Sequence, residues 1–67
     1  MFLIARLDQE TGWESDWLVD LAPASERVHV TTRRENARRF KRESDAASVR
    51  DMAASIAPES RWRVVPA

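Results

Sequence analysis

Basic residues are concentrated in the middle of this chain, where six fall within positions 33–42 and only one acidic residue interrupts them. Arginine side chains match phosphate and carboxylate oxygens in bidentate geometry, so such a cluster could bind a nucleic-acid backbone or dock onto an acidic protein surface. It could also be a solvated face that pairs with acidic loops of the same chain. The members of the cluster are Arg33, Arg34, Arg38, Arg39, Lys41 and Arg42.

Acidic residues predominate before this cluster, so the formal net charge of zero hides a segregation of charge. Residues 1–26 carry a net charge of −5, and residues 27–42 carry +6. Carboxylates are the ligands that calcium and magnesium prefer, but the spacing of the acids here does not match the loop of an EF-hand. We therefore expect a solvated acidic loop, which could meet a partner's nucleic-acid-binding surface by standing in for phosphates. Its acids are Asp8, Glu10, Glu14 and Asp16.

Two tryptophans, Trp13 and Trp17, bracket these acids in the sequence "GWESDW". Tryptophan that is partly exposed among charges is typical of binding hot spots. Alternatively, both rings complete the core of a small domain. The sequence leaves both interpretations open.

A catalytic or metal site would need a nucleophile beside a base, a carboxylate pair with separated pKa values, or a cluster of ligands. His29 is the only histidine and the chain has no cysteine. We expect His29 to face solvent from a strand, and we expect no enzymatic activity, cofactor or metal. A fold without cysteine does not depend on an oxidising compartment, which favours a cytoplasmic location. The apolar run at the N-terminus falls well short of the ~20 residues that cross a bilayer.

Hydrophobic periodicity predicts an α+β fold. Apolar patterns indicate four strands, at 2–7, 16–21, 27–32 and 61–65. A period of 3.6 over residues 44–57 predicts the main helix, with Ser44 as its N-cap and Pro58 ending it. We expect a single domain over residues 1–67, in which a small antiparallel sheet of three to four strands carries this helix on one face.

The same patterns predict which side chains share a face. Period-two alternation places Trp17, Val19 and Leu21 together on the second strand. Ala37 and Phe40 are three residues apart, so we expect a short helical turn anchored by Phe40, with Arg34 and Arg38 on one side of it. The expected core between sheet and helix consists of Phe2 or Leu3, Trp17, Val30, Phe40, Ile56 and Trp62.

The runs "VTTRRENARRF", "SDAASVRDMAASI" and "WRVV" together resemble a pattern common in very short phage and prophage open reading frames. In that pattern a strand ends in Thr, an "ENA..F" turn buries an Ala and an aromatic residue, and a helix and a "W.V" strand follow. The resemblance covers about half of the chain and implies a phage-type accessory protein. Such proteins are often inhibitors that occupy a host protein surface, anti-CRISPR proteins and polymerase inhibitors among them. The matching residues are Thr31, Ala37, Phe40, Ala46, Val49, Ile56, Trp62 and Val64.

We therefore expect a small non-enzymatic interaction protein that binds a larger host protein complex and inhibits or modulates it. The arginine cluster would steer association, and Trp13 or Phe40 would supply apolar contact area. The alternative is a nucleic-acid-binding regulator that uses residues 33–42. The segregated charges and any unpaired edge strand also leave homodimerisation open.

Overall fold

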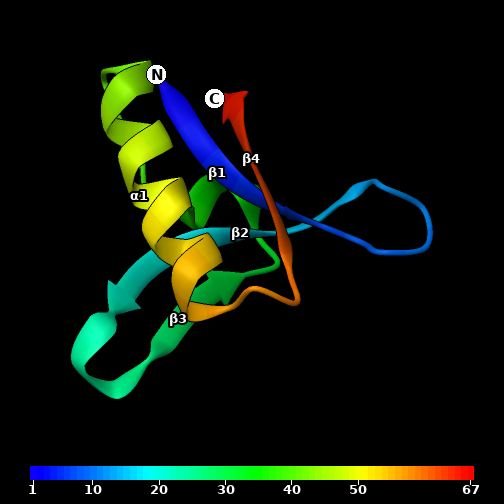
Figure 1. The fold of residues 1–67 in the computed structure, drawn as a ribbon. Helices are drawn as coiled ribbons and strands as arrows, with labels where there is room; N and C mark the ends of the chain where they lie inside the picture. The colour runs from blue at the N-terminus through cyan, green and yellow to red at the C-terminus, as the bar shows by residue number, and fades with distance from the viewer.

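The computed structural model describes all 67 residues, which form four strands, one α-helix and two short 3₁₀ helices (Figure 1). The strands are β1 (Phe2–Leu7), β2 (Glu14–Ala22), β3 (Arg27–Thr31) and β4 (Arg61–Pro66), and the helix is α1 (Glu43–Ile56). The 3₁₀ helices are η1 (Pro23–Ser25), between β2 and β3, and η2 (Arg34–Asn36), after β3. The predicted α+β class is confirmed, and the antiparallel sheet has four strands in the order β3-β2-β1-β4.

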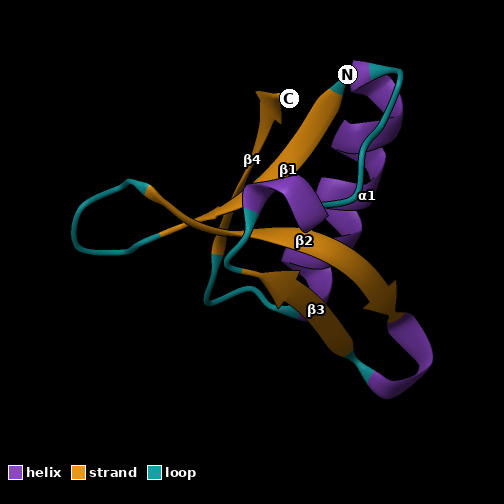
Figure 2. Cartoon of the chain, turned by 180° about the vertical axis from the view of Figure 1, so that it is seen from behind, coloured by secondary structure: helices purple, strands orange, loops and turns teal.

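Both faces of the sheet are covered, one by α1 and the other by η2 (Figure 2). The core on the α1 side consists of Ile4, Leu18, Phe40 and Ala46, with Phe2, Leu21, Val28, Val49, Trp62 and Val64 packed against them. The core on the η2 side consists of Leu3, Ala5, Ala37 and Val65, with Leu7 and Trp17 packed against them. Because β1 lies inside the sheet, its central residues are buried on both sides, which explains its continuous apolar run. Each fully buried large side chain contributes about 1.5–3 kcal/mol of transfer free energy.

A β-bulge in β2 overturns the predicted sharing of faces. Leu18 pairs with Val30 and Asp20 pairs with His29, so Val19 is an extra residue without a partner. One extra residue reverses which side the following residues face. Leu18 and Leu21 consequently share the α1 side, and Trp17 lies on the η2 side rather than in the core under the helix.

Helix α1 begins and ends one residue before the predicted limits of 44–57. Its N-cap is Arg42, with extended backbone at φ −112° and ψ 135°, so the prediction of Ser44 as N-cap is wrong. No side chain caps this end, but two acids in the first turn, Glu43 and Asp45, complement the positive end of the helix dipole. Pro58 follows the C-cap, as predicted.

The predicted short helical turn is present as η2, with Ala37 as its C-cap, but the chain is extended after it, so Phe40 does not anchor the turn as expected. The backbone N–H of Arg38 donates to the Leu18 carbonyl at 3.0 Å. Phe40 and Phe2 exchange two backbone hydrogen bonds, of 2.7 and 2.9 Å. Residues 38–40 thus lie between β2 and the start of β1, where β1 has no pairing with β2. Ala37 and Phe40 are both buried, as expected, but in the cores on opposite faces of the sheet.

We predict that Phe40→Ala unfolds most of the protein at 25 °C. Truncating a buried phenylalanine costs about 3–5 kcal/mol, which is on the order of the whole stability that a single core provides at this size. Far-UV circular dichroism and the dispersion of amide resonances measure the loss. Met52→Ala on the outer side of α1 is the control, because Met52 is 46% exposed and its truncation should change stability by about 0.5 kcal/mol or less. Native dispersion in Phe40→Ala would contradict the role given to this residue.

Candidate functional site

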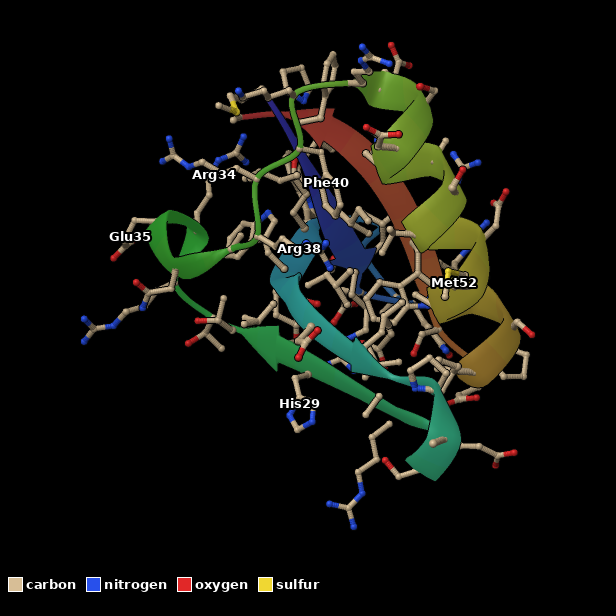
Figure 3. All side chains as sticks on the ribbon, turned by 90° about the vertical axis from the view of Figure 1, so that its left-hand side faces the viewer. His29, Arg34, Glu35, Arg38, Phe40 and Met52 are labelled. Carbon is tan, nitrogen blue, oxygen red and sulfur yellow. The ribbon has the colours of Figure 1, made fainter.

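Most charged side chains of this protein are exposed, and Asp16 is the buried exception. The structure contains no pocket, and no three acidic or histidine side chains lie close enough together to hold a metal ion. His29 is exposed on β3 and points away from the body of the molecule, as expected (Figure 3). No helix is long and apolar enough to cross a bilayer. The candidate sites are therefore two charged surfaces at opposite ends of β1.

The first surface is the loop between β1 and β2, residues 8–13, which we name the Trp13 loop. Its backbone is closed by hydrogen bonds from the Asp8 N–H to the Trp13 carbonyl and from the Gly12 N–H to the Asp8 carbonyl, both 2.8 Å. Gly12 has a φ of 75°, in the left-handed region that glycine adopts without strain. The Gln9 side-chain amide donates to the Glu59 carbonyl and ties the loop to the turn before β4. Hydrogen bonds thus join the two ends of this exposed loop and connect it to the turn before β4.

The Asp8 side chain adds a further constraint to this loop. One carboxylate oxygen accepts hydrogen bonds from the backbone N–H groups of Thr11 at 3.0 Å and Glu10 at 2.8 Å. These bonds, first the one from Thr11 and then the one from Glu10, hold the pKa of Asp8 below its ordinary value because they favour the charged carboxylate.

The structure decides between the two interpretations of the tryptophans. Trp13 is 76% exposed and is the last residue of the loop before β2. The loop extends away from the sheet (Figure 1). Trp17 is half-buried on the η2 side of the sheet, and its indole N–H donates to Glu14 at 3.1 Å. Trp13 is therefore a candidate contact residue, whereas Trp17 belongs to the core.

The four acids that we expected to share one exposed loop are separated. Asp16 lies in β2 and is only 7% exposed. It stands directly opposite Arg6 across the β1–β2 pair and binds the Arg6 guanidinium in bidentate geometry, at 2.8 and 2.5 Å. Glu14 accepts a hydrogen bond from Arg34 at 3.0 Å in addition to the one from Trp17. Only Asp8 and Glu10 remain in the exposed loop.

The six basic residues are also divided between two environments. Arg34 pairs with Glu14, donates to the Pro66 carbonyl and lies over the Trp17 ring, with its guanidinium carbon 5.9 Å from the ring centroid. Among the three interpretations of the arginine cluster, the structure thus shows pairing with an acidic residue of the same chain for Arg34. Because residues 37–40 are extended, Arg34 and Arg38 do not share one side of a helical turn as expected.

The second surface consists of the exposed residues Arg38, Arg39, Lys41 and Arg42, which we name the basic strip. None of these residues forms an ion pair, and neither does Arg33 beside η2. The Arg38 guanidinium carbon lies 5.0 Å from the centroid of the Phe40 ring and covers it (Figure 3). This contact and the backbone hydrogen bonds of residues 38 and 40 hold the strip in place.

The two surfaces lie at opposite ends of β1. Phe2, at the start of this strand, pairs with Phe40 of the basic strip segment, and Leu7, at its end, leads into the Trp13 loop. Six extended residues span roughly 20 Å. The two surfaces can therefore contact different molecules.

Comparison with known proteins found no matching family model, no matching curated protein and no matching solved structure. The proposed function therefore rests on these two surfaces.

Sequence reasoning missed the Arg6–Asp16 pair, whereas the Arg34–Glu14 pair is an instance of the internal pairing with acidic residues that the sequence left open. Their members are separated by ten and twenty residues in the chain. Strand register would have identified the first pair, because residues directly opposite on neighbouring strands interact. No local signal indicates the second, which depends on where η2 folds back.

We predict that Asp8 makes stability depend on pH in the acid range. Its pKa in the folded protein lies below that in the unfolded chain, so the stabilising contribution of the charge is complete above the unfolded pKa and disappears as the pH falls through the folded pKa. Asp8→Asn keeps an acceptor oxygen but loses the charge. Unfolding by urea between about pH 6 and about pH 2 should show the stability difference between the two proteins shrinking as the pH falls. A difference that stays constant over this range would contradict the assignment.

We predict that Trp13 dominates the quenching of tryptophan fluorescence by acrylamide, because it is 76% exposed whereas Trp17 and Trp62 are half-buried. Trp13→Phe should remove the readily quenched component of the emission. Trp17→Phe is the matched control and should leave that component in place. Unchanged quenching in Trp13→Phe would place this ring in a protected environment instead.

Proposed function

We propose that this chain is a small non-enzymatic protein that binds a larger protein partner through the Trp13 loop and blocks or modulates that partner by occupying its surface. The observation that carries the proposal is a tryptophan that is 76% exposed on a loop closed by backbone hydrogen bonds. Tryptophan is among the residues most enriched at binding hot spots.

The rigidity of the loop favours tight binding. Association loses free energy when a flexible segment must become ordered, and a preorganised loop avoids much of this loss. The hydrogen bonds of Asp8, Gly12 and Gln9 already order the Trp13 loop in the free protein. The indole ring can then enter an apolar pocket with little additional cost beyond its own side-chain rotamer.

The charges around Trp13 indicate the chemistry of the partner. Asp8 and Glu10 lie in the loop, Glu59 lies in the turn to which Gln9 is bonded, and none of the three forms an ion pair. Arg61, opposite Leu7 on β4, is a nearby cation, and the three acids outnumber it. Electrostatic complementarity then favours a partner whose apolar pocket is rimmed by lysine or arginine. Surfaces that bind nucleic acid have this character, so we propose a nucleic-acid-associated protein as the partner.

The resemblance to short phage and prophage reading frames indicates how binding would affect the partner. Accessory proteins of that type often inhibit a host complex, as anti-CRISPR proteins do. We therefore propose inhibition or modulation of a host protein complex, in the cytoplasm of the host cell.

We predict that Trp13→Ala weakens partner binding at least about 30-fold, which corresponds to about 2 kcal/mol for a hot-spot residue. Tagged wild-type protein and the variant are used to capture partners from a nuclease-treated bacterial lysate, and captured proteins are identified by mass spectrometry. The affinity of the purified pair is then measured. Met52→Ala is the control, because Met52 is the exposed apolar side chain of α1, away from the loop. Equal capture by Trp13→Ala and wild type, or no protein that survives nuclease treatment, would refute the proposal.

A further inference from the structure

We propose that the basic strip binds the phosphate backbone of a nucleic acid, at a site separate from the Trp13 loop. Four exposed cations, Arg38, Arg39, Lys41 and Arg42, lie within five consecutive residues without an ion pair. Arg33 adds a fifth unpaired cation on the same segment of chain. No acidic side chain of this protein therefore forms an ion pair with these cations.

The backbone of the strip is fixed before any ligand arrives. Residues 38 and 40 are held by three backbone hydrogen bonds, one to Leu18 and two to Phe2. Phe40, which is buried at 6% exposure, fixes the centre of the segment, and the charged side chains on either side of it project into solvent. Binding a phosphate polymer then requires the ordering of side chains only.

The strip itself contains no exposed aromatic residue, and the exposed apolar side chain at this end of β1 is Met1, next to Phe2. Protein interfaces depend on apolar or aromatic anchors at their centre. The only aromatic residue within the strip, Phe40, is buried in the core and covered by Arg38. Contacts to a phosphate backbone need only cations and hydrogen-bond donors. The Trp13 loop has the opposite properties, acidic charge with an exposed aromatic ring.

The strip has no exposed aromatic side chain beside its cations. No aromatic residue is available there for stacking, and the helix that follows presents acids, Glu43 and Asp45, in its first turn. Recognition is therefore expected to be independent of sequence, with affinity set by the phosphates that are neutralised. This inference does not rest on the proposed protein partner, since the two surfaces lie at opposite ends of β1.

The test is the salt dependence of binding to labelled DNA, measured by fluorescence anisotropy with the purified protein. If all four cations contact phosphates, the affinity for a duplex should fall about 150-fold between about 50 and about 200 mM salt, and the affinity for a single strand about 50-fold. Removing two contacts with Arg39→Ala/Lys41→Ala should reduce these falls to about 12-fold and about 7-fold. Comparing the duplex and single-strand arms identifies which form the strip prefers.

The control is Arg61→Ala/Arg63→Ala, which removes the same charge from exposed, unpaired positions on β4. It should leave the salt dependence unchanged, and circular dichroism should show that both double variants are folded. Three results would overturn the inference. One is a lack of DNA binding at low salt, and the second is an equal effect of the two double variants. The third is equally tight binding of a polyglutamate peptide through Arg39 and Lys41, which would make the strip a site for an acidic protein.

Discussion

The pair of backbone hydrogen bonds between Phe2 and Phe40 is the contact on which the rest of the structure depends. It brings residues 38–40 alongside β1 where β2 has left it, and so satisfies backbone groups that would otherwise be unpaired. It also places the Phe40 ring under α1 while Ala37 stays on the opposite face of the sheet. The two cores are thus joined through one short segment, and the helix begins three residues after it.

A domain of this size has little apolar surface to bury, and this chain buries more of it by covering both faces of its sheet. Two ion pairs accompany that arrangement, one partly buried and one exposed. Arg6 and Asp16 meet on the α1 side beside Trp62, and Arg34 and Glu14 meet on the η2 side over Trp17. Each guanidinium group is paired with a carboxylate and lies over a tryptophan ring, so neither arginine is free to bind a partner.

Among the charged residues without an ion pair, two groups lie at opposite ends of β1, while others, such as Arg61 and Arg63, lie on β4. Asp8 and Glu10 lie at one end, next to an exposed tryptophan, and the basic strip lies at the other end, with no exposed aromatic residue. The first combination suits a protein pocket and the second suits a phosphate polymer. A protein that engages both at once would be suited to complexes in which protein and nucleic acid are already associated.

Residue patterns were sufficient to predict the four strands, the helix within one residue, the α+β class and the segregation of charge, because periodicity and composition are local properties. Which charged residues are free to bind a partner depends on the folded arrangement of the chain. The bulge at Val19 adds one residue to β2 and so separates the faces of Trp17 and Leu21, an effect that no alternation pattern shows. Asp16 and Arg34 look like members of charged clusters in the sequence, yet both are paired with residues distant in the chain. Cross-strand register and the fold-back of η2 create those pairs, and neither is encoded within a local window of sequence.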